Sequence, residues 1–162
     1  MTQTSPLTTA QTGVLVLLRL LIGWHFLYEG VIKLYSPGWT AKGYLLSATY
    51  MESFFHSLAS ESMISTIDTL NIAALLIVGV ALILGFKTQA ASLIGVGLLL
   101  MYYLAHPPFP GYPLGPAEGS YWIVKKNLIE AAALLVIFLF PTSVSFGLER
   151  FFAKKEIQTQ PN

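Results

Sequence analysis

The first long apolar stretch of the chain carries four polar residues that would be costly to expose to lipid. It covers residues 13–35 and is long enough, at about 1.5 Å per residue, to cross the ~30 Å hydrocarbon core of a bilayer as a helix. A charge near the middle of such a helix costs roughly 2.5–3.5 kcal/mol on insertion scales. The stretch therefore predicts one helix of a bundle with a polar interior. On a helical projection the four residues share about one third of the circumference: Arg19, His25, Glu29 and Lys33.

Composition places the chain among membrane proteins and excludes several kinds of chemistry. Of its 162 residues, 54% are hydrophobic and 10% are charged, whereas about 25% of residues are charged in soluble globular domains. The formal net charge of +1 and the lack of a basic run give no electrostatic basis for binding nucleic acid. Because the chain has no cysteine, disulfides, iron–sulfur clusters and thiolate metal sites within it are excluded.

Four apolar segments predict an all-α fold, an integral membrane four-helix bundle. The turn between the second and third segments is short, which is typical of two antiparallel helices. Pro141 ends the last segment, because proline cannot continue a helix. The predicted boundaries are 1–12 for a polar N-terminal tail, 13–142 for a single membrane domain with spans at 13–35, 66–86, 89–106 and 122–141, and 143–162 for a cytoplasmic C-terminal tail.

The long connection between the first two spans predicts an amphipathic helix on the extracytoplasmic membrane surface. Apolar residues recur there at helical spacing and aromatic residues accompany them, as in helices that lie in the membrane interface. We expect this helix to cover the mouth of the bundle. Its apolar stripe contains Tyr44, Ala48, Met51, Phe55 and Leu58, with Trp39 and Phe54 as further aromatic anchors.

Orientation in the membrane is predicted from the basic residues. Lys87 in the short hairpin and Arg150 in the C-terminal tail favour the cytoplasmic side for both segments, because cytoplasmic loops carry an excess of lysine and arginine. The raw count of basic residues at the two ends of the bundle is tied. The prediction is a multi-pass protein with both termini in the cytoplasm.

The four-span topology brings most polar residues of the spans to one membrane face. Span one ends there, span two begins, span three ends and span four begins, so residues far apart in sequence become neighbours. Buried carboxylates and a histidine are candidates for proton transfer: Glu29, Glu130 and His25. The candidate residues for binding a cofactor around them are Lys33, Tyr102, Tyr103, His106, Lys126 and Asn127.

A purely structural interpretation of the same residues is open beside the functional one. Glu29 and Lys33, and likewise Lys126 and Glu130, are four positions apart, so each pair can form an ion pair within its helix. Arg19 would then join two helices. The functional interpretation is a proton-conducting or ligand-binding pocket, because ionisable residues inside a membrane are functional by default.

The residues of the polar face indicate which other ligands it can take. We predict no haem, because no second axial histidine lies at the depth of His25, and no metal, because no compact ligand motif occurs in the sequence. His25 can serve as a hydrogen-bond partner for a quinone. The tyrosines and Trp122 can be interface anchors or an aromatic lining for a quinone ring.

Three segments of the chain resemble the DoxX family. They read LLRLLIGWHFLYEGVIKLYSPGW, GVALILGFKTQAASLIG and KNLIEAAALL, and correspond to the family's first span, its second hairpin and its last span. The resemblance implies a four-helix protein of the bacterial inner membrane, related to DoxD, the small membrane subunit of thiosulfate:quinone oxidoreductase. No catalytic role comes with the matching residues, which are Arg19, Gly30, Lys33, Lys126 and Asn127.

Together, the residues and the resemblance predict a quinone-interacting subunit of a membrane-associated oxidoreductase. Its polar site would lie at the extracytoplasmic mouth of the bundle, with quinone as cofactor and a soluble or peripheral oxidoreductase subunit as partner. The alternative is a non-catalytic membrane anchor or assembly subunit that docks a partner protein, and a homo-oligomer is compatible with either. A small transporter is a third alternative, but the sequence lacks the inverted repeats that are common in transporters.

Overall fold

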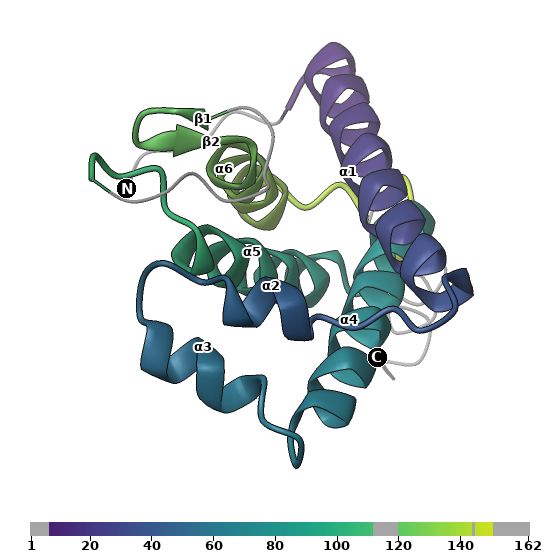
Figure 1. The fold of residues 1–162 in the computed structure, drawn as a ribbon. Helices are drawn as coiled ribbons and strands as arrows, with labels where there is room; N and C mark the ends of the chain where they lie inside the picture. The colour runs from purple at the N-terminus through teal and green to yellow at the C-terminus, as the bar shows by residue number, and fades with distance from the viewer. Residues whose placement is uncertain (1–6, 112–119, 144, 151–162) are drawn as a thin grey trace, which may run out of the picture.

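The structure is a computed structural model that describes residues 7–111, 120–143 and 145–150 (Figure 1). Helices make up most of these residues, and a short antiparallel hairpin pairs Ser120 with Lys125. The elements in chain order are α1 (Thr9–Tyr35), α2 (Lys42–Leu46), α3 (Glu52–Leu58), α4 (Ile64–Leu84), α5 (Thr88–Ala105), β1 (Ser120–Tyr121), β2 (Val124–Lys125) and α6 (Lys126–Leu139).

Helix α1 begins earlier than the sequence pattern predicted. The Thr8 hydroxyl accepts a hydrogen bond from the backbone N–H of Gln11, and the Gln11 side chain accepts one from the Thr8 N–H. This reciprocal cap satisfies backbone donors that the first turn leaves without partners. Residues 9–12, predicted to belong to a polar tail, are therefore helical, and residues 1–6 lie outside the described residues.

Within the described part of the chain, three helices are long and apolar enough to cross a membrane, namely α1, α4 and α5. The predicted fourth span at 122–141 is shorter in the structure, because residues 120–125 form the hairpin and α6 starts at Lys126. Trp122 in the hairpin turn has φ +60°, a conformation that does not continue into a helix. With 14 residues, α6 is about 21 Å long.

The main apolar core draws on all four long helices. Helix α1 packs along α4, α5 packs along α6, and α4 and α5 pack against each other (Figure 1). Many apolar side chains on the outside of these helices stay exposed, as expected for surfaces that meet lipid. The buried core residues are Ile22, Phe26, Leu75, Val78, Leu82, Ala91, Leu99, Ala131, Leu134 and Ile137.

Gly79 sets the close approach of α4 to α1. A Cβ atom at this position would lie 2.5 Å from the Leu27 backbone nitrogen and 2.7 Å from its Cα. Such close packing supplies much of the attraction between helices in lipid, where the hydrophobic effect contributes little. Gly97 on α5 has no such role, because a Cβ atom there would meet nothing within 4 Å.

The connection between α1 and α4 contains two short helices where the sequence pattern predicted one. Met51 has φ +52° and separates α2 from α3. The break lets the chain bend toward the end of α5, where the Thr49 N–H donates to the Ala105 carbonyl at 2.9 Å. Helices α2 and α3 thus cover the end of α5 with a second apolar cluster. Its buried residues are Ala41, Leu45, Ala48, Phe55, Ala59 and Ala105.

The C-terminal segment folds back onto the opposite end of the bundle. The Arg19 guanidinium, only 3% exposed, donates to the Thr142 hydroxyl at 3.1 Å and to the Phe146 carbonyl at 2.6 Å. The Glu149 N–H donates to the Gly85 carbonyl at the end of α4. Residues 143 and 145–150, predicted to be part of a tail, are therefore docked, and residues 151–162 lie outside the described residues.

Candidate functional site

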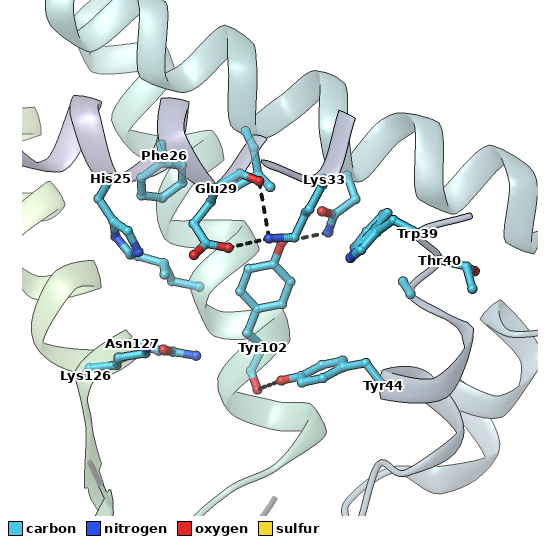
Figure 2. Close-up of a pocket in the computed structure, with 14 residues that line it drawn as sticks. His25, Phe26, Glu29, Lys33, Trp39, Thr40, Tyr44, Tyr102, Lys126 and Asn127 are labelled. Atoms are coloured by element: carbon cyan, nitrogen blue, oxygen red, sulfur yellow. Dashed lines mark hydrogen bonds and ion pairs between the residues drawn. The ribbon is translucent and has the colours of Figure 1, made fainter. Parts of the chain in front are cut away.

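A cavity of about 310 Å³ lies at one end of the helix bundle (Figure 2). We call it the mouth cavity. The end of α1, the start of α4, the end of α5 and the start of α6 all contribute to it, together with the segment that leads into α2. Its lining residues are His25, Phe26, Glu29, Lys33, Trp39, Thr40, Ala41, Tyr44, Asn71, Leu75, Leu99, Tyr102, Lys126 and Asn127.

Glu29 and Lys33 form an ion pair along α1 at the edge of the mouth cavity. The Lys33 ammonium donates to the Glu29 carboxylate, four residues earlier in the helix. The same ammonium lies 5.7 Å from the centre of the Trp39 ring, within the range of a cation–π contact. The side chains are 43% and 18% exposed for Glu29 and Lys33. The local spacing of the sequence predicted this pair correctly.

Glu130 has a different partner from the one its sequence spacing favoured. Its Oε1 atom lies 2.6 Å from Nδ1 of His25 on α1. Among the described residues, no ion pair forms between Glu130 and Lys126. The reason is geometric, because Lys126 opens α6 and is exposed, whereas the Glu130 side chain is 15% exposed and turned toward α1. A carboxylate bonded to an imidazole is an arrangement that can hold and release a proton.

Two tyrosines and an asparagine form the opposite wall of the mouth cavity. The Asn71 amide donates to the Tyr102 hydroxyl at 2.6 Å, and the Tyr44 hydroxyl donates to the Tyr102 carbonyl at 2.9 Å. The two tyrosine rings meet edge to face, with centroids 6.1 Å apart. Burial, with a smaller contribution from Tyr102, raises the pKa of the Tyr44 hydroxyl. The hydroxyl of Tyr44 is therefore neutral and acts as a donor.

The rim of the mouth cavity comes from the segment between α1 and α2, none of whose residues was among the predicted binding residues. Trp39, Thr40 and Ala41 follow α1 and line the cavity, and the Ala41 N–H donates to Asp68 Oδ1 at 2.8 Å. Asp68 near the start of α4 thereby positions the rim against the bundle. The sequence contains one signal for this contact. Asp68 has no basic residue one helical turn away, so its carboxylate needs a partner elsewhere in the chain.

Tyr103 and His106, predicted as binding residues, lie outside the lining of the mouth cavity. The Tyr103 hydroxyl donates to the Ile123 carbonyl at 2.8 Å. The His106 side chain is buried, and its Nε2 atom lies 3.2 Å from the Tyr44 carbonyl. Both side chains join the end of α5 to neighbouring segments. Of the other predicted residues, His25, Glu29, Lys33, Tyr102, Lys126 and Asn127 line the cavity, and Glu130 adjoins it through His25.

The fold and the site define a helical membrane protein with a polar cavity at one end of its bundle. The chain belongs to the DoxX family, whose model matches residues 14–107, more than half of the sequence. This confirms the family that the sequence motifs resembled. The match extends from α1 to the end of α5, so it does not include α6 with Lys126 and Asn127. Searches of curated proteins and of solved structures found no match.

Proposed function

We propose that this DoxX-family protein is a quinone-interacting subunit of a membrane-associated oxidoreductase. The quinone head group binds in the mouth cavity. The observation that carries the proposal is the composition of this cavity, in which aromatic rings from Trp39, Tyr44 and Tyr102 lie with the Glu29–Lys33 pair (Figure 2). Its volume of about 310 Å³ is at the lower end of the range of ligand pockets, which suits one ring.

The polar groups of the cavity match what a quinone ring offers. A quinone is flat and carries two carbonyl acceptors, so it needs stacking surface and hydrogen-bond donors. The Tyr102 hydroxyl accepts its hydrogen bond from Asn71, which leaves its own proton to donate to a ligand. Lys33 and the Asn127 amide are further donors in the lining.

Reduction of a quinone to a quinol takes up two electrons and two protons. Glu29 lines the cavity, and the His25–Glu130 pair adjoins it, so these groups pass protons to the two quinone oxygens. The proposed source of the electrons is a soluble or peripheral partner subunit. An iron–sulfur cluster held by cysteines of this chain is excluded as that source, because the sequence has none.

The proposed topology has four spans, with both termini in the cytoplasm and the mouth cavity at the extracytoplasmic face of a bacterial inner membrane. Helix α6 is the fourth span, although its length of about 21 Å is less than the ~30 Å core. A short span is accommodated by local thinning of the bilayer or by residues at the interface. The exposed Trp122 and Ile123 of the hairpin preceding α6 are suited to that interface.

The test begins with gentle purification and mass spectrometry of bound lipids and co-purifying proteins. Binding of a quinone to the purified protein is then compared in Tyr102→Phe and Tyr103→Phe. Tyr102→Phe removes the hydroxyl at the cavity and should weaken binding roughly fivefold, the value of about one hydrogen bond. Tyr103→Phe is the matched control, because its hydroxyl bonds to the Ile123 carbonyl outside the lining.

Turnover provides a second test once the partner is identified. Glu29→Gln combined with Glu130→Gln should abolish quinone reduction while the protein is still expressed in the membrane. Unchanged turnover, or the absence of any bound quinone, would refute the proposal. If the variants instead lose the co-purifying protein and no quinone binds, the chain is a non-catalytic anchor or assembly subunit.

A further inference from the structure

A second cavity follows the seam between α1 and α6 toward the other end of the bundle. It has a volume of about 440 Å³ and an almost entirely apolar lining. Helix α1 contributes Ala10, Val14 and Leu15, and the end of the α6 segment contributes Val136 and Phe140. We call this cavity the seam groove.

The seam groove and the mouth cavity lie on the same side of α1. Val14 precedes His25 by about three helical turns, which places the two side chains within about 20° of each other around the helix and about 16 Å apart along it. Leu18 and Leu21 lie on the face between them by the same spacing. The His25–Glu130 bond crosses from α1 to α6 at the mouth end of this seam.

The seam is open sideways, toward the region that lipid occupies around a membrane protein. Helix α1 packs chiefly along α4 and has few contacts with α6 (Figure 1). Val14 and Leu21 are 66% and 60% exposed, and Phe140 is 46% exposed. The imidazole of His25 is also 42% exposed. A molecule dissolved in the bilayer therefore has access to both cavities along one side of the protein.

We propose that the seam groove binds the isoprenoid or alkyl chain of the ligand whose head group occupies the mouth cavity. This inference rests on the proposed function. It follows from the alignment of the two cavities along one side of α1. Both include residues of α1 and of the α6 segment, and charged groups line the first whereas the second is almost entirely apolar. The rise of about 16 Å along α1 from Val14 to His25 fits within the ~30 Å hydrocarbon core. The ligand class is a membrane-soluble ring with a long hydrocarbon chain.

The test compares a quinone that has a long chain with the same ring without one. A diazirine label near the end of the chain should crosslink to residues 10–15 and to the Val136–Phe140 region, as located by mass spectrometry. Ala10→Phe and Val14→Phe fill the groove and should weaken binding of the chain-bearing quinone roughly tenfold. Binding of the ring alone should not change. Leu17→Phe is the control, because Leu17 is exposed on α1 but does not line the groove.

The possible failures are distinguishable. If the ring alone binds as tightly as the chain-bearing quinone and the crosslinks scatter over the lipid-facing helices, the groove holds only bulk lipid. That result overturns this inference and leaves the proposed function standing. If neither quinone binds to the wild-type protein, the proposed function fails and the inference fails with it. The crosslinking arm uses the wild-type chain, so it does not depend on the folding of a variant.

Discussion

Nδ1 of His25 on α1 lies 2.6 Å from Oε1 of Glu130 on α6, although 105 positions separate the two residues in the chain. The bond joins two helices that otherwise touch little, since α1 packs mainly along α4. It also borders the mouth cavity, because His25 is part of the lining. The pair therefore combines a structural contact with a group that can exchange protons.

The His25–Glu130 contact should be measurable as a coupling energy. We expect His25→Phe and Glu130→Leu each to lower the free energy of unfolding by roughly 1–3 kcal/mol, because each leaves a polar partner unpaired. The double variant should cost less than the sum of the two single variants. Unfolding in detergent provides the measurement, with Lys126→Gln as the exposed control. Strictly additive losses would show that the two residues do not interact.

Arg19 should hold the C-terminal segment to the bundle. Arg19→Met leaves the Thr142 hydroxyl and the Phe146 carbonyl without their donor, so we expect a loss of roughly 2–4 kcal/mol in stability. Residues 145–150 should become sensitive to limited proteolysis, with the cleavage sites read by mass spectrometry. Arg150→Gln is the control, because Arg150 is exposed. Equal protease resistance in all three proteins would contradict the assignment.

Gly79 should tolerate no side chain. Gly79→Ala places a Cβ atom against the backbone of Leu27, which forces α1 and α4 apart and should cost roughly 1–3 kcal/mol. Gly97→Ala is the matched control in another span. It meets nothing within 4 Å and gains about 0.5–1 kcal/mol from the higher helix propensity of alanine. Melting temperatures of the two variants in the same detergent should therefore move in opposite directions.

The stability of the cap over α5 should depend on pH through His106. Burial is the largest cause that lowers the pKa of this imidazole, and the charge of Lys125 adds to it. The unfolded chain then binds the proton more readily, so the stabilising contribution is present above the ordinary histidine pKa of about 6.5 and is lost as the pH falls below it. The slope is at most about 1.4 kcal/mol per pH unit.

Unfolding between pH 7.5 and 5.5 tests this dependence. His106→Gln should show a smaller loss of stability than the wild-type protein over that range. His56→Gln is the control for removal of an imidazole at another site, because His56 lies on the exposed surface of α3. A His106→Gln profile parallel to that of the wild type would remove His106 as the source.

Features set by local periodicity were predictable from the sequence. The apolar runs predicted four spans, and three of the described helices are long and apolar enough to cross a membrane. The family also followed from motifs within the apolar runs. The Glu29–Lys33 pair was also predictable, because residues four positions apart lie on the same face of a helix. The same rule failed for Glu130, whose partner comes from α1. A spacing rule proposes partners within one helix and contains no information on a neighbouring helix.

The fourth helix and the rim of the mouth cavity show a second limit. Hydrophobicity alone extended the last span back to residue 122, but the residues before Lys126 form a hairpin. Trp39 and Tyr44 looked like interface anchors, yet both line the cavity. Their positions depend on contacts such as the bond from the Ala41 N–H to Asp68, which joins residues 27 positions apart.

The sequence alone therefore determines that the chain forms apolar helices and that the first of these helices carries a polar stripe. Both features depend only on the pattern of apolar and polar residues along each helix. Which members of that stripe share a site depends on how the helices are rotated and spaced. Gly79 brings α4 against α1, and the rim folds over the end of the bundle. As a result Arg19 joins the C-terminal segment, Lys33 lies at the mouth cavity, and His25 connects that cavity to α6.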